Sequence, residues 1–155
     1  MTYLSDKTLD MFKDLDRAWG LTEIPLPVRV AYMVDCLDLI APRLPPSVRK
    51  EFEIVKKMVP SETSKTALKN VRRRCQDWIL QQTKRSGGWE KSEVSAMEAL
   101  VDILDEFQRM ESDPRAGHFH FYLAIILDID GTLNRPIEIL TQKHFSPYFA
   151  ADEEA

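Results

Sequence analysis

The chain has 155 residues, of which 44% are hydrophobic and 30% are charged, and its formal net charge is −4. A chain of this length forms one domain with a core that is stable without disulfides, which excludes a disulfide-dependent mini-protein and wholesale disorder. No apolar run reaches the ~20 residues of a membrane helix, and the N-terminus lacks the apolar core of a signal peptide. We therefore expect a cytoplasmic protein with no membrane partner, in which Cys36 and Cys75 are buried free thiols.

The charges are unevenly distributed along the chain. The segment 43–85 contains twelve basic and four acidic residues, a balance of +8, whereas the remainder contains nine basic and twenty-one acidic residues, a balance of −12. These segments either neutralise each other once packed, which we favour, or form a basic face for nucleic acid or an acidic face for a basic protein.

Apolar residues recur at helical spacing through the first two thirds of the chain. Ser5 is suited to cap the first helix, and Pro25 and Pro27 indicate a loop over 21–27. The segment 28–40 is apolar on nearly every side, which is typical of a helix buried among several neighbours. From this periodicity we predict helices over residues 5–19, 28–40, 65–84 and 90–110, and a short helix that begins at Pro46 or Ser47 and ends at Val59.

The last two of these predicted helices are amphipathic, and their outer sides have opposite charge. The helix over 65–84 has a basic outer side, and the helix over 90–110 has an acidic one. The outer residues predicted in this way include Lys65, Lys69, Arg72 and Arg73 on the first helix, and Glu93, Asp102, Asp105 and Glu106 on the second.

The stretch 116–133, AGHFHFYLAIILDIDGTL, is compatible with two structures. Its alternating His and Phe residues suit a buried strand, whereas a buried helix fits the same length. We favour the helix, because the preceding segments are helical and a lone strand has nothing to pair with. Pro136 begins a last short helix that ends near His144, so we divide the chain into a helical domain, 1–145, and an acidic tail, 146–155.

The string AIILDIDGTL resembles the first motif of the haloacid dehalogenase superfamily, an apolar strand followed by Asp-x-Asp-Gly-Thr. The resemblance implies a magnesium-dependent phosphatase in which Asp128 is the nucleophile and Asp130 the general acid/base. That fold needs a much longer segment after the motif than the twenty-two residues present. We therefore favour a helix that ends at Leu127, with both aspartates in a turn capped by Gly131, and keep the phosphatase as an alternative.

The histidines and aspartates of this region do not have the spacing of a metal site. A calcium-loop alignment on Gly131 places Ile126 and Ile137 where carboxylates are required. His118 and His120 are two residues apart, a spacing that brings side chains together on a strand but not on a helix. We expect no metal and no cofactor.

The order of the helices is similar to that of the small all-α immunity proteins of bacterial toxin systems. The similarity lies in RVAYMVDCLDLI before a proline turn, ALKNVRRRCQDWI in mid-chain, and AGHFHFYLA late in the chain. The chain departs from that pattern because it lacks an Arg-Pro pair in the second loop and has fewer alanines. The resemblance implies an inhibitor that covers a toxin's active site through a charged helical face.

We therefore predict an all-α protein, an irregular or orthogonal bundle of five to seven helices, that binds a protein partner without catalysis. Nucleic-acid binding through the basic helix 65–85 is a second alternative, which the acidic net charge disfavours. The sequence leaves the oligomeric state open. The residues expected to contact the partner are Glu93, Asp102, Asp105 and Glu106, or Arg72 and Arg73, together with Trp89 beside a Gly-Gly loop.

Overall fold

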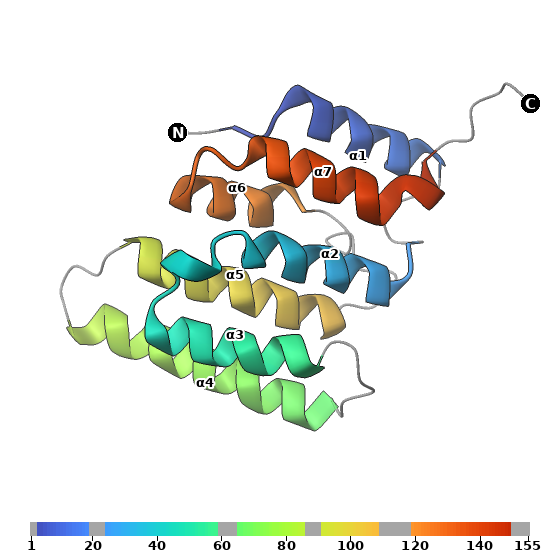
Figure 1. Cartoon of the computed structure of the whole chain (residues 1–155). Helices are drawn as coiled ribbons and strands as arrows, with labels where there is room; N and C mark the ends of the chain where they lie inside the picture. The colour runs from blue at the N-terminus through green and yellow to red at the C-terminus, as the bar shows by residue number, and fades with distance from the viewer. Residues whose placement is uncertain (1–2, 19–23, 59–64, 86–90, 109–118, 150–155) are drawn as a thin grey trace, which may run out of the picture.

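The computed structural model describes residues 3–18, 24–58, 65–85, 91–108 and 119–149. Within these segments the chain forms seven α-helices and two short 3-10 helices and contains no strand, so the all-α prediction is confirmed (Figure 1). The α-helices are α1 (Asp6–Ala18), α2 (Leu26–Asp38), α3 (Pro46–Met58), α4 (Lys65–Arg85), α5 (Lys91–Gln108), α6 (His120–Ile129) and α7 (Asn134–Phe145). The 3-10 helices are η2 (Ala41–Arg43) and η3 (Ser146–Tyr148).

The helices stack in layers, with α1 and α7 on one side of the bundle and α3 and α4 on the opposite side (Figure 1). Between them, α2 packs against α5 and α7, and α5 also packs against α3, α4 and α6. The central position of α2 was predicted from its apolar sequence. None of the helices in the described segments combines the length and the apolarity that crossing a bilayer requires.

Helices α2 and α7 begin earlier than the positions of their prolines indicated. Helix α2 begins at Leu26, so Pro27 lies in its first turn rather than in a loop. Helix α7 begins at Asn134, with Pro136 in its first turn. Proline is tolerated there because the first N–H groups of a helix have no partner within the helix. In α1 the predicted cap is confirmed, since the Thr8 N–H donates to Ser5 Oγ at 3.3 Å.

Helix α5 is buried on most of its sides. Ala96 and Ala99 let neighbouring helices approach closely, and Leu100 and Ile103 are fully buried. The prediction that Glu106 belongs to the acidic outer side of this helix is wrong, because Glu106 is 1% exposed. The physical reason is that α5 contacts α2, α3, α4 and α6, so that residues 100–106 are buried or partly buried.

The ambiguous stretch forms a helix over 120–129, followed by a turn over 130–133. Helix α6 ends at Ile129, two residues later than predicted, and Asp130 is its C-cap in an extended conformation, with φ −144° and ψ 100°. Asp128 therefore lies in the last helical turn, not in the turn that follows. The predicted tail also begins too early, because Tyr148 and Phe149 pack against the core. Residues 150–155 lie outside the described residues.

Both cysteines are free and buried, as predicted. Burial raises the pKa of the Cys36 thiol far above its ordinary value and that of Cys75 to about 12. Since the thiolate is the reactive form, neither cysteine should react with a disulfide reagent such as DTNB near pH 8 while the protein is folded. Both should react after unfolding in urea, which absorbance measurements follow directly. A fast stoichiometric reaction of the folded protein would contradict this burial.

Candidate functional site

The two charged faces predicted from the sequence meet each other where α4 packs on α5. Arg72 Nε of α4 donates to Asp105 Oδ1 of α5 at 2.6 Å, and both side chains are about 30% exposed. Arg72 also donates to Gln76 Oε1. Two of the predicted partner contacts, one from each alternative face, are therefore paired within the molecule.

A third predicted contact, Glu106, lies inside the bundle. Its Oε1 accepts a hydrogen bond from Arg29 Nε at 2.9 Å, and the two side chains are 1% and 5% exposed, respectively. Arg29 also donates to the Ile24 carbonyl, so the guanidinium has two partners from different segments. As a surface contact, Glu106 is a wrong prediction: the pair links the central helices α2 and α5.

Of the remaining predicted acidic contacts, Asp102 has a described side chain, and it provides little open surface. Asp102 is partly buried on α5 and already takes part in an interaction within the chain. Glu93 belongs to α5, but its side chain lies outside the described part of the structure, as does all of Trp89. The predicted acidic face is thus reduced by burial and internal pairing at Asp102, Asp105 and Glu106.

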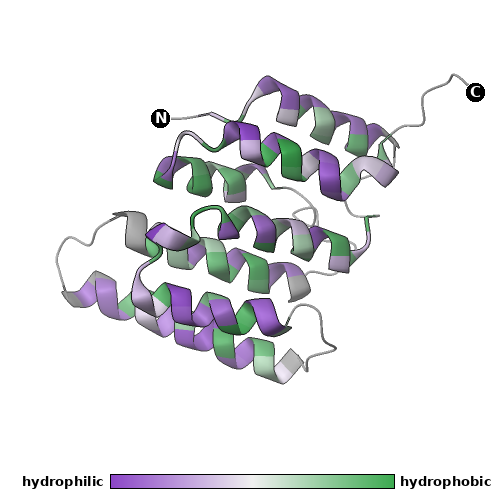
Figure 2. Ribbon diagram, viewed as in Figure 1, coloured by the Kyte–Doolittle hydropathy of each residue, from purple (hydrophilic) through white to green (hydrophobic). Residues whose placement is uncertain are grey.

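The outer sides of α3 and α4 carry exposed cations, which we call the basic surface: Lys50, Lys57, Lys69, Arg73 and Lys84. None of the five has an ion-pair partner in the segments described by the structure. Figure 2 shows hydrophilic residues along both helices on this side of the bundle.

Internal ion pairs position the two helices that bear the basic surface. Arg74 of α4 donates from Nε and Nη2 to the two carboxylate oxygens of Glu51 on α3, each at 3.1 Å. This two-point contact fixes geometry as well as charge. On α3, Lys56 lies 3.0 Å from Asp38 Oδ1 of α2. The basic surface therefore consists of the cations that these internal pairs leave available.

Leu80, which the sequence analysis did not identify, belongs to the same part of α4. It is 56% exposed and lies seven residues after Arg73 and four before Lys84, so all three side chains follow one side of the helix. Asp77 is exposed on that side as well. The sequence signal was available, because Leu80 is seven residues after Arg73, which was predicted to lie on the outer side of this helix.

The motif that resembles a phosphatase site has a structural environment of its own. Its apolar part lies in α6, not in the strand that the resemblance implies. Asp130 Oδ1 accepts hydrogen bonds from the Thr132 hydroxyl at 2.6 Å and the Thr132 N–H at 3.0 Å, which lower the pKa of Asp130, and Arg43 lies 3.7 Å from its other oxygen. Asp128, two residues earlier in the last turn of α6, is exposed. This arrangement accounts for Asp130 as a residue that stabilises a turn.

The histidines are dispersed in the structure. His144 Nε2 lies 2.6 Å from Asp35 Oδ2 and links α7 to α2, whereas the ring of His120 packs on Phe12. His118 lies outside the described residues. In the segments available for inspection, no three His, Cys, Asp or Glu side chains are placed to hold one metal ion.

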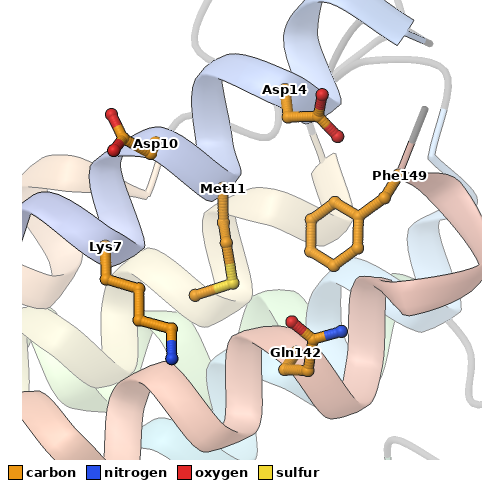
Figure 3. Close-up of a pocket in the computed structure, with 6 residues that line it drawn as sticks. All are labelled: Lys7, Asp10, Met11, Asp14, Gln142 and Phe149. Atoms are coloured by element: carbon orange, nitrogen blue, oxygen red, sulfur yellow. The ribbon is translucent and has the colours of Figure 1, made fainter. Parts of the chain in front are cut away.

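A groove that the sequence did not reveal runs between α1 and α7 (Figure 3). It has a volume of about 490 Å³ and is open to solvent, and it adjoins a second hollow of about 290 Å³ along α7. We call the two together the α1–α7 groove. Its lining residues are Lys7, Asp10, Met11 and Asp14 of α1, Arg135, Glu138, Ile139, Gln142 and Lys143 of α7, and Phe149.

Which of these surfaces is functional has to be inferred from the residues of this chain. Comparison with protein-family models, with curated proteins and with solved structures gives no match for this chain.

Proposed function

We propose that the chain is a non-catalytic protein-binding module that binds an acidic partner protein through its basic surface. The observation that supports this proposal most strongly is the set of five exposed cations on α3 and α4 without acidic partners among the described residues. Opposite charges across an interface accelerate association and select the partner.

The alternative acidic face receives less support from the same structure. Glu106 neutralises Arg29 in the core, and Asp105 pairs with Arg72 at the α4–α5 contact. A basic partner would have to compete with these internal cations for both carboxylates. An acidic partner that binds the basic surface has no internal ion pair to break among the described residues, which is why we prefer this surface.

A protein partner fits the basic surface better than nucleic acid does. Protein interfaces combine an apolar centre with a charged rim, and Leu80 between Arg73 and Lys84 supplies such an apolar element. Asp77 on the same side of α4 would repel a phosphate backbone. Nucleic-acid binding through helix 65–85 is therefore the competing outcome that the experiment has to separate.

The finer proposal is an immunity-type inhibitor that covers the active site of a toxin, acting in the cytoplasm of a bacterium. Its support is the resemblance in helix order. The two buried free thiols also suit a reducing compartment.

The test compares two pairs of cations with the same spacing on helices at opposite sides of the bundle. K69Q/R73Q removes a Lys-x-x-x-Arg pair from the basic surface, and K13Q/R17Q removes such a pair from α1. Proteins are captured from lysate of the source organism with and without nuclease treatment. The captured partner is identified, purified and titrated by biolayer interferometry. K69Q/R73Q should weaken binding of the true partner by about tenfold at low salt, mainly through slower association, and K13Q/R17Q should leave it unchanged.

Each alternative outcome is distinguishable. A partner that binds K69Q/R73Q as tightly as the unmodified chain would contradict the use of the basic surface. Capture that disappears after nuclease treatment, with heparin retention that falls steeply with salt, would replace the proposal by nucleic-acid binding.

A further inference from the structure

The α1–α7 groove is held in a defined shape by hydrogen bonds at one end. The Ser5 N–H donates to Asn134 Oδ1 at 2.9 Å, and the Ser5 hydroxyl donates to Glu138 Oε1 at 2.8 Å. Asn134 Nδ2 in turn donates to the Tyr3 carbonyl at 2.9 Å. These contacts join the start of α1 to the start of α7, so a ligand would find the groove already formed and would lose less entropy on binding.

The groove has apolar side chains along its length. Met11 of α1 and Phe149 line the larger hollow, where Figure 3 shows both side chains directed into the space between the helices. Ile139 of α7 lines the neighbouring hollow and is 54% exposed. The lining spans residues 7–14 of α1, which is about two helical turns or roughly 10 Å.

The groove is lined by charges of both signs. On the α1 edge, Asp10 is exposed, Asp14 lies in the wall 2.9 Å from Arg17, and the exposed Lys7 lines both hollows; Figure 3 shows Lys7, Asp10 and Asp14 on α1. On the α7 edge, Lys143 is exposed, and the charge of Glu138 is offset by Arg135 at 3.2 Å. A ligand of a single sign would therefore meet like charges as well as opposite ones, Asp10 being the exposed acid and Lys7 and Lys143 the exposed bases.

We propose that this groove binds an amphipathic α-helix of a partner protein. The helix has an apolar ridge that contacts Met11, Ile139 and Phe149, a basic edge that faces Asp10 and an acidic edge that faces Lys143. A helix lying between two helices is an established mode of peptide recognition, in which apolar anchors at i, i+3, i+4 and i+7 enter the groove. A small molecule fits less well, because such ligands are bound in pockets that enclose most of their surface.

The proposed site goes beyond the basic surface and does not depend on it. The groove lies between α1 and α7, whereas the basic surface lies on α3 and α4 at the opposite side of the bundle (Figure 1). The two proposals can therefore fail separately.

Three fluorescent, helix-stapled peptides of about fourteen residues, or four turns, test the site by anisotropy titration against the full chain. All have one leucine ridge, and their edges are one acidic and one basic, both acidic, or both basic. The mixed peptide should bind at least about fivefold more tightly than either single-sign peptide. Asp10→Lys makes both groove edges basic and should transfer the preference to the acidic peptide, and Lys143→Glu should transfer it to the basic peptide.

Two apolar substitutions with matched exposure localise the binding. Ile139→Glu in the groove should weaken the mixed peptide by about tenfold, whereas Leu80→Glu on α4, at 56% exposure, should leave it unchanged. Circular dichroism melts verify that the variants remain folded. Equal binding of the three peptides, unchanged binding to Ile139→Glu, or loss of binding in K69Q/R73Q would overturn the proposal. So would a dimer of the chain alone that Ile139→Glu dissociates, because a second copy would then occupy the groove.

Discussion

Replacing Glu106 by alanine should destabilise the protein by about 3–5 kcal/mol, because the substitution leaves the Arg29 guanidinium buried without its counter-charge. The Arg29 and Glu106 side chains are 5% and 1% exposed and lie 2.9 Å apart. Water cannot replace the lost carboxylate at such a depth without opening the contact between α2 and α5. Urea denaturation monitored by circular dichroism measures the loss as a lower unfolding free energy.

The neighbouring residue provides a matched control. Asp105→Ala removes an acid one position earlier on the same helix, but its pair with Arg72 is about 30% exposed. Solvent screens such a pair, so the expected loss is less than about 1 kcal/mol. If the two alanine variants lose similar amounts of stability, Glu106 is not in the environment described.

A double substitution separates the burial of a lone charge from the loss of the pair. R29M/E106L replaces both charged groups by apolar side chains of similar size. It should recover most of the stability lost in E106A and come within about 1–2 kcal/mol of the unmodified chain. Recovery should be incomplete, because a methionine side chain has no N–H group to replace the one that Arg29 donates to the Ile24 carbonyl.

The helix positions and the central place of α2 were accessible from the sequence, but the side of α5 that faces solvent was not. Periodicity locates the apolar stripe of a helix and indicates that its other residues face solvent. This holds for a helix that packs against its neighbours on one side only. Helix α5 contacts helices on several sides, so Glu106 is buried. Two features of the sequence indicated the burial of Glu106. It follows Ala99 and Ile103 at helical spacing, and Arg29, which lies in a largely apolar segment, needs an anionic partner once it is buried.

The α1–α7 groove could not have been predicted in the same way. Its walls come from residues 7–14 and 135–149, which are far apart in the sequence and share no motif. Only the packing of α1 on α7 brings Met11 close to Gln142 and Phe149. The basic surface was predicted in part, since Arg73 was among the predicted contacts. Its extent could not be predicted, because it depends on which cations form ion pairs within the chain. Arg72 and Arg74 have such partners, and their neighbour Arg73 has none among the described residues.

Phe119→Ala should destabilise the protein by about 3–5 kcal/mol, the range for removing a buried aromatic side chain, whereas Phe121→Ala should change stability by less than about 0.5 kcal/mol. Phe119 is 2% exposed at the N-cap of α6, and Phe121 in the first turn is 80% exposed. The ring of Phe119 lies 5.2 Å from that of Tyr32 and 5.9 Å from that of Phe145, so its removal opens a cavity between helices. Urea denaturation of both variants under the same conditions provides the comparison.

This pair also decides between the two structures that the sequence allowed for 116–133. Residues two apart point to the same face of a strand, whereas on a helix they diverge by about 200°. A buried strand would therefore place Phe119 and Phe121 on one side and give them similar effects on stability. A large loss at Phe119 with almost none at Phe121 is the result that the helix requires. Similar losses of stability in the two variants would contradict the helical structure of α6 and its contact with α5.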